Sequence, residues 1–343
     1  MGGKKMAKKL GVLLVVLSVV FVVVLSACGK SKSPAAPAAT ATTVPLSEFA
    51  TWDTVTPGTI FDARMWPSVM VFNNKVWVIA GMQDPGGTYY NDVWSTTDCG
   101  HWTQETASAN FSPRFRQSCT VYNGKMWLIG GSHDGNDANN DVWSSSNGVD
   151  WTLVTGNAAF GPRFAHKTVV YNGKLWVVSG QDSSTMLKDA WYSTNGADWF
   201  AATRNANFLE GMVNFGLIVF KGKMWIMCGE TNGQKSKLVY NSTDGITWTA
   251  IVNVPFLDKV APTYYVYGNM LYLGNGHSDA GSGVMADMWR TADGYSWELV
   301  ADPVSYGGIM KQAAVNFNGK VYLIGGSTDS DTGWSVNNVY VNQ

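Results

Sequence analysis

The chain has few ionisable side chains for its length. Asp, Glu, Lys and Arg together make up 14% of its 343 residues. Residues 1–45 hold six lysines and no acidic residue, so the remainder holds 18 basic and 25 acidic residues, a net charge of about −7. Because a nucleic-acid-binding protein needs a basic footprint for the phosphate backbone, this acidic body excludes nucleic acid as a partner.

Cysteine and histidine are scarce, with four residues of each. Three cysteines fall in the body of the chain, at Cys99, Cys119 and Cys228, and an odd number in separate repeats argues against a disulfide framework. No histidine has the spacing of a zinc site. The oxygen-rich segments 134–141 and 329–333 lack the full calcium-loop pattern and are expected to form turns. We therefore expect no metal and no cofactor.

A single long apolar run follows a lysine-rich start near the N-terminus. It leads into L-S-A-C, which ends at Cys28 and resembles the lipobox of bacterial lipoproteins. The resemblance implies lipidation of Cys28 and an extracytoplasmic place on a bacterial membrane, in the periplasm or at the cell surface. Residues 1–27 are interpreted as a lipoprotein signal peptide, residues 28–46 as a flexible Ala/Pro/Thr/Ser tether, and residues 47–343 as the folded body. A plain signal anchor is the alternative.

Aromatic residues and glycine are abundant, with 16 Trp, 37 Gly and 13% Phe, Trp and Tyr. This composition is typical of many short strands joined by tight turns. One phrase recurs along the chain, for example VYNGKMWLIGG (121–131) and VYNGKLWVVSG (170–180). Its aromatic residue occurs six times at steps of 50, 49, 49, 47 and 50 residues, at Trp77, Trp127, Trp176, Trp225, Tyr272 and Tyr322. A period near 50 residues indicates a repeat architecture.

Each repeat holds four strand candidates, which we call a to d in chain order. An Asn-Gly turn joins a to b, a D-V-W-like motif opens c, and an Asp/Asn-Gly turn before a Trp leads into d, as in NGVDW (147–151). Four short strands per repeat fit a β-propeller in which each repeat is one blade. The G-G…D-V-W…W pattern resembles the kelch repeat. We therefore predict an all-β, six-bladed propeller of kelch type with four antiparallel strands per blade.

The last repeat lacks strand d, and a matching segment occurs at the other end of the chain. Residues 51–65 resemble residues 150–164 closely, and both segments contain a Trp followed by the F-x-x-R motif. We therefore expect the strand at residues 52–56 to complete the last blade. Such closure would leave no free sheet edge for aggregation.

The d–a and b–c loops open on one face of the predicted ring, which we call the top, and the short a–b and c–d turns share the bottom. The top loops vary most, so function is expected there. They carry the candidate ligand-binding residues, which are the cations Arg64, Arg114, Arg116, Arg163 and Lys259 and the acids Asp134, Asp182, Glu230 and Asp279.

Two interpretations of these charges stay open. The arginines would hold an anionic or hydroxyl-rich ligand with forked donors, or they would pair with the acids in a repeated structural network. The loss of the arginine in the fourth and sixth repeats favours a ligand, because a purely structural ring would have no evident reason to lose it.

The resemblance to kelch propellers implies a non-catalytic module that binds a protein or glycan ligand on the top face. The alternative is a carbohydrate-active enzyme at the central pit, because some bacterial six-bladed kelch proteins resemble N-acetylneuraminate epimerase. The catalytic candidates would then be Glu230, His166 and Arg114. An acid and a base must both reach one substrate atom, and this condition requires a structure to test.

Overall fold

The computed structural model describes residues 51–55, 60–207, 211–278, 283–328 and 335–342. Contacts divide the chain into two compact units, Met1–Ala41 and Thr42–Gln343. The predicted signal peptide, Cys28 and the tether all lie outside the described residues. Every described strand belongs to the second unit, which is a self-contained fold with its own core.

The described strands form six four-stranded antiparallel sheets, which we number as blades 1 to 6. Blade 1 contains β2 (Ser68–Phe72), β3 (Lys75–Gln83), β4 (Thr88–Thr96) and β5 (Thr103–Thr106). Blade 2 contains β6 (Ser118–Tyr122), β7 (Lys125–Ser132), β8 (Ala138–Ser145) and β9 (Thr152–Thr155). Blade 3 contains β10 (Lys167–Tyr171), β11 (Lys174–Val178), β12 (Ala190–Ser193) and β13 (Phe200–Thr203).

The second half of the ring repeats this order. Blade 4 contains β14 (Gly216–Phe220), β15 (Lys223–Met227), β18 (Val239–Ser242) and β19 (Thr249–Ile251). Blade 5 contains β20 (Thr263–Tyr267), β21 (Met270–Gly274), β24 (Met288–Thr291) and β25 (Glu298–Ala301). Blade 6 contains β26 (Ala313–Phe317), β27 (Lys320–Ile324), β28 (Val339–Asn342) and β1 (Trp52–Thr54). Two short ribbons are β16 (Glu230–Thr231) with β17 (Gln234–Lys235), and β22 (His277–Ser278) with β23 (Gly283–Val284).

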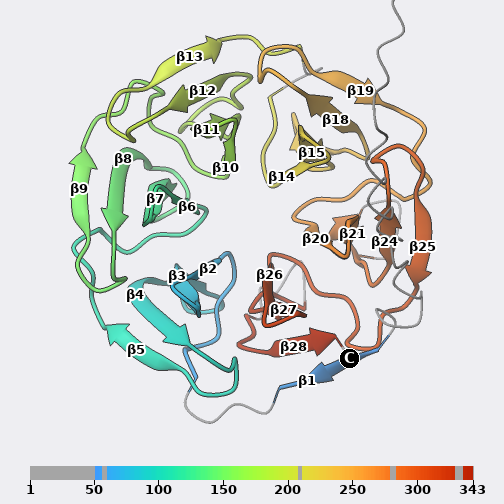
Figure 1. Ribbon diagram of the computed structural model, residues 1–343, viewed down its shortest axis with the longest axis horizontal. Helices are drawn as coiled ribbons and strands as arrows, with labels where there is room; N and C mark the ends of the chain where they lie inside the picture. Colours follow the sequence, from blue (N-terminus) through green and yellow to red (C-terminus); the bar gives the residue numbers. More distant parts are fainter. Residues whose placement is uncertain (1–50, 56–59, 208–210, 279–282, 329–334, 343) are drawn as a thin grey trace, which may run out of the picture. The chain divides into compact units, whose positions relative to one another are not determined.

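The blades follow one another around a central axis, with strand a of each blade innermost and strand d outermost (Figure 1). The predicted all-β, six-bladed propeller is therefore confirmed. The described residues contain no helix that is long and apolar enough to cross a membrane.

The last blade is closed by the two ends of the unit, as predicted. Strand β1 pairs antiparallel with β28, in the register Trp52↔Asn342, Asp53↔Val341 and Thr54↔Tyr340 (Figure 1). Trp52 is 6% exposed and lies against aromatic rings of blades 5 and 6. Because β1 covers the backbone groups of β28, blade 6 has the same four strands as the others.

The hydrophobic core lies between the blades rather than inside any one of them. Six apolar clusters each combine residues of two adjacent blades, including blade 6 with blade 1. The strand-b tryptophan of one blade packs on the c–d turn of the next. At Gly148, an added Cβ would lie 2.0 Å from a ring carbon of Trp77, so the turn accepts only glycine there. Large aromatics suit this role because each buried ring contributes roughly 1.5–3 kcal/mol.

The repeated turn sequences act through local hydrogen bonds. In the a–b turn, Asn123 and Gly124 both have positive φ, as a two-residue hairpin requires. In the c–d turn, the Asn147 side-chain oxygen accepts from the amides of Val149 and Asp150. The bottom face is therefore built from short, self-bonded turns.

Candidate functional site

The F-x-x-R cations predicted to face a ligand are buried inside the blades. Arg64, Arg114, Arg163 and Lys259 are each at most 1% exposed. Each forms an ion pair of 2.6–2.8 Å with the first residue of the D-V-W-like motif in its own blade. The partners are Asp92, Asp141, Asp189 and Asp287.

These ion pairs have a structural task. Arg64, for example, binds both oxygens of Asp92 and also donates to the carbonyl oxygen of Ala80. Asp92 in turn accepts from the indole nitrogen of Trp94. The pair thus joins the d–a loop to strands b and c, and the network interpretation applies, although its acids are not those we expected from the b–c loops.

The described b–c loop acids belong to three different blades. Asp134 is exposed and Asp182 is half-buried, and each accepts hydrogen bonds from two amides of its own loop. The half-buried Glu230 opens the β16–β17 ribbon. Asp279 lies outside the described residues.

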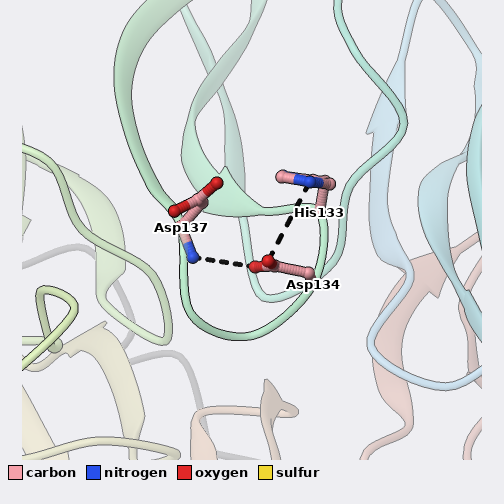
Figure 2. A group of neighbouring side chains, drawn as sticks. All are labelled: His133, Asp134 and Asp137. Atoms are coloured by element: carbon pink, nitrogen blue, oxygen red, sulfur yellow. Dashed lines mark hydrogen bonds and ion pairs between the residues drawn. The ribbon is translucent and has the colours of Figure 1, made fainter.

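One exposed group has metal-binding residue types. His133, Asp134 and Asp137 offer ligand atoms within 4.8 Å of one another, on the loop after β7 (Figure 2). The amides of Asp137 and Asn136 lower the pKa of Asp134, and the His133 ring lies 4.0 Å from its carboxylate. Asp134 closes the loop through these amides, as expected of a turn at the start of segment 134–141. Segment 329–333 lies outside the described residues.

At the top mouth of the central channel, one backbone conformation recurs in every blade. Two residues after each F-x-x-R position the chain adopts positive φ between 51° and 62°, at Trp66, Arg116, Ala165, Asn214, Ala261 and Lys311. Between neighbouring blades these residues are joined by backbone hydrogen bonds, such as Ala165 N to Arg116 O at 2.9 Å and Ala261 N to Asn214 O at 2.8 Å. Because all six blades share this strained conformation, it belongs to the architecture, and only the side chains differ.

A cavity of about 180 Å³ lies inside this ring of residues. It is smaller than the roughly 300–1,000 Å³ of most small-molecule pockets, so it fits one compact chemical group. Its charged lining residues are Arg116, Lys167 and Lys311, and no Asp or Glu lines it among the described residues. A basic pocket therefore stands at the centre of an acidic body.

Arg116 is the central cation of this pocket. Its guanidinium carbon lies 4.4 Å from the ring centroid of Trp66, and Lys311 Nζ lies 4.6 Å from the same ring. No carboxylate is within ion-pair distance of Arg116 among the described residues, and its buried Nε has no hydrogen-bond partner there. Burial lowers the pKa of Arg116, and the more distant charge of Glu230 opposes this shift.

His166 forms part of the channel wall. It is 1% exposed, and the backbone of Ile129 is its one weak polar contact, since neither ring nitrogen has a hydrogen bond of good geometry among the described residues. Its pKa is held well below the usual value by burial first, and then by the charges of Arg163 and Lys167. The side chain is therefore neutral at pH 7. Of the three catalytic candidates, only His166 lines the pocket, because Arg114 is paired with Asp141 and Glu230 lies outside the lining.

Of the pocket residues, Arg116 and His166 are predicted from the sequence, whereas Trp66, Lys167 and Lys311 are not. A signal for them was present, because all lie two to four residues after an F-x-x-R position. Aligning that offset across the six repeats, rather than the arginine itself, would have outlined the pocket.

Comparison with known proteins agrees with this architecture. The model of the KLHDC2/KLHL20/DRC7 kelch-repeats domain matches residues 43–229. A solved structure described as "Structure of YjhT" superposes with a TM-score of 0.68 and 17% sequence identity, covering 84% of this chain and all of that one. At that identity the likeness supports the fold alone. No curated protein matches the chain in sequence. The matched domain covers more than half of the chain, and the chain therefore belongs to the kelch-repeat family.

Proposed function

We propose that this propeller is a recognition module that binds an anionic group of a protein or glycan ligand in the central pocket of its top face. The observation that carries the proposal is the guanidinium of Arg116, which lines the pocket without a carboxylate partner among the described residues. A half-buried cation in this state is stabilised when a ligand supplies the missing negative charge.

The neighbours of Arg116 add to this preference. Trp66 contacts both Arg116 and Lys311, which come from the blades that flank its own. Lys167 also lines the pocket and has no ion-pair partner among the described residues. Because like charges that share a small volume repel one another, an anion would relieve the repulsion as well as form new contacts.

The enzymatic alternative has less support. It requires Glu230, His166 and Arg114 to reach one substrate atom. Arg114 is enclosed with Asp141, and a buried His166 that stays neutral has no acid beside it in the pocket lining. Binding without catalysis accounts for the same residues with fewer requirements.

Membrane attachment through Cys28 is the second part of the proposal. It rests on the resemblance of residues 25–28 to a lipobox and on the tether that follows. The propeller would then be presented outside the cytoplasm of a bacterial cell. Mass spectrometry of protein isolated from membranes would show whether Cys28 carries acyl chains, and an unmodified N-terminus would contradict this part.

The binding part is tested with fragment 42–343, which is the self-contained unit. Isothermal titration calorimetry against glucuronate, galacturonate, N-acetylneuraminate and an acidic peptide is compared with neutral glucose. Arg116→Ala introduces the residue that blades 3 and 5 carry at this position. It should weaken binding of the anionic ligand at least tenfold, because a hydrogen bond to a charged group contributes about 1.5–3 kcal/mol.

Arg204→Ala is the matched control, since Arg204 is exposed and does not line the pocket. It should leave the affinity unchanged. The proposal fails if none of the anionic ligands binds, or if Arg116→Ala binds as tightly as the unaltered fragment.

A further inference from the structure

Blade 3 departs from the repeat at two neighbouring positions of its outer strands. Tyr192 on β12 pairs with Phe200 on β13, and both side chains are large and aromatic. The same pair is made of small or charged residues in four other blades. The four pairs are Ser95 with Thr103, Ser144 with Thr152, Asn241 with Thr249, and Arg290 with Glu298.

Together with Trp176 these residues form an aromatic row across three strands. The ring centroids of Trp176 and Tyr192 are 5.5 Å apart, and those of Tyr192 and Phe200 are 5.8 Å apart. Trp176 is buried in the interface with blade 4, whereas Phe200 is 54% exposed. The row therefore runs from the core out to solvent, and core packing does not explain its outer end.

Trp176 and Tyr192 of this row line a cavity of about 460 Å³ between blade 3 and blade 4, and Phe200 continues the row beyond its lining. The opposite wall is the c–d turn of blade 4, with Asp244 and Ile246. The hydroxyl of Tyr171 bonds to two carbonyl oxygens of blade 4 turns, those of Gly222 at 2.8 Å and Thr243 at 3.1 Å. These bonds fix one blade against the other, so the cavity has rigid walls on the bottom face, away from the basic pocket.

Polar groups of both signs lie beside the aromatic rings. Lys174 Nζ is 3.9 Å from the ring centroid of Tyr192 and has no ion-pair partner among the described residues. One oxygen of Asp244 accepts from the amides of Ile246 and Thr247, while the other has no hydrogen-bond partner there. A donor and an acceptor thus remain available next to flat apolar surfaces.

We propose that this groove is a second ligand site, which binds the pyranose rings of a neutral carbohydrate. A sugar ring presents C–H groups on its faces and hydroxyl groups around its edge. The C–H groups carry partial positive charge and match the negative faces of aromatic rings. The hydroxyl groups both donate and accept, so they match Asp244 and Lys174 together, and the balance of these two charges favours an uncharged ligand.

The test uses fragment 42–343 and three neutral β-1,4-linked hexasaccharides, of glucose, mannose and xylose, in isothermal titration calorimetry. The variant is Tyr192→Ser with Phe200→Thr, which introduces the residues that blades 1 and 2 carry at these positions. It should bind the preferred hexasaccharide at least tenfold more weakly. Phe200→Thr alone removes the half-exposed ring that packs on Tyr192 at the outer end of the row, and it should weaken binding in the same direction.

Two controls separate this site from others. Tyr295→Ser removes a 45% exposed tyrosine of blade 5, a blade that contributes no residue to the groove lining, and it should leave the affinity unchanged. Arg116→Ala should also leave it unchanged, so the groove and the basic pocket succeed or fail separately. The proposal is overturned if none of the three hexasaccharides binds, if binding persists in both groove variants, or if the groove variants instead lose binding of a hydrophobic peptide.

Discussion

At the scale of single residues, one exception to the repeat is explained by the residue that it faces in the preceding blade. Four c–d turns place a glycine against a strand-b tryptophan, such as Gly148 against Trp77. Blade 1 has Cys99 at this position, with φ of 63°, and it packs in one cluster with Tyr322 of blade 6. Tyrosine is smaller than tryptophan, so it leaves room for the extra side-chain atoms. Burial raises the pKa of Cys99 to about 12, which is consistent with an inert packing role.

His166 gives a pH dependence whose sign follows from its burial. The folded state holds the ring neutral, whereas the unfolded chain protonates it near pH 6.5. Below that pH the unfolded state binds one more proton, so the free energy of unfolding falls as the pH falls and is fully retained above about 6.5. The loss should approach about 1.4 kcal/mol per pH unit at most.

Urea unfolding at pH 7.5 and pH 5.5 measures this effect in fragment 42–343 and in His166→Gln. Glutamine is a matched replacement, because Gln117 and Gln312 hold the same position in blades 2 and 6. Both proteins lose some stability on acidification through their carboxylates, but the unaltered fragment should lose more. An equal loss in the two would mean that His166 is protonated in the folded state.

At the scale of the element, five of the d–a loops face strand c through one pair of residues. Blades 1 to 3 use Arg with Asp, blade 5 uses Lys259 with Asp287, and blade 4 has two apolar residues, Met212 and Leu238. The arginine is therefore lost in blade 4 together with its acid. For blade 4, this pairing explains the loss of the arginine without a ligand.

The blade 4 pair predicts the outcome of a double-mutant cycle in blade 3. Arg163→Met or Asp189→Leu alone should cost about 3–5 kcal/mol of unfolding free energy, because each leaves one buried charge unpaired. The double variant recreates the apolar pair of blade 4 and should be more stable than either single variant, although the Trp191 indole loses its acceptor. Chemical unfolding of the four proteins gives the comparison. Losses that simply add would show that the two charges do not depend on each other.

How well the sequence predicts a contact within a blade depends on how many positions separate the two residues along the chain. The hairpin turns and the c–d turns were predictable because their hydrogen bonds join residues two or three apart. The Arg64–Asp92 pair spans 28 positions, and the nearer acid Asp84 was an equally reasonable partner on sequence distance. Which of two acids faces the guanidinium depends on strand register, and residue order alone does not specify it.

At the scale of the whole molecule, the sequence predicts the ring in full but the pocket only in part. The number of blades follows from six copies of one motif, and the closure follows from the similarity of residues 51–65 to residues 150–164. The pocket depends on the direction of each side chain at the axis. Arg114 and Arg116 are two residues apart, yet one is enclosed in its blade and the other lines the channel. A residue with left-handed backbone conformation lies between the loop and the strand, and it turns the chain so that the two side chains take different directions. Amino-acid composition does not reveal this turn.

Closure by β1 makes the stability of the ring depend on a segment distant in sequence from its partner. Fragment 60–343 lacks β1 and exposes the backbone of β28, and it loses Trp52, whose removal should alone cost about 3–5 kcal/mol. It should therefore melt at a lower temperature than fragment 42–343 and self-associate through the open edge, as light scattering would detect.

A synthetic peptide of residues 42–59 should raise the melting temperature of fragment 60–343. The same peptide with Trp52→Ala should do so much less, since Trp52 packs against Tyr265 and Tyr306. If fragment 60–343 were as stable and monomeric as fragment 42–343, five complete blades and a three-stranded sixth would suffice, and β1 would be an accessory strand rather than the closure of the ring.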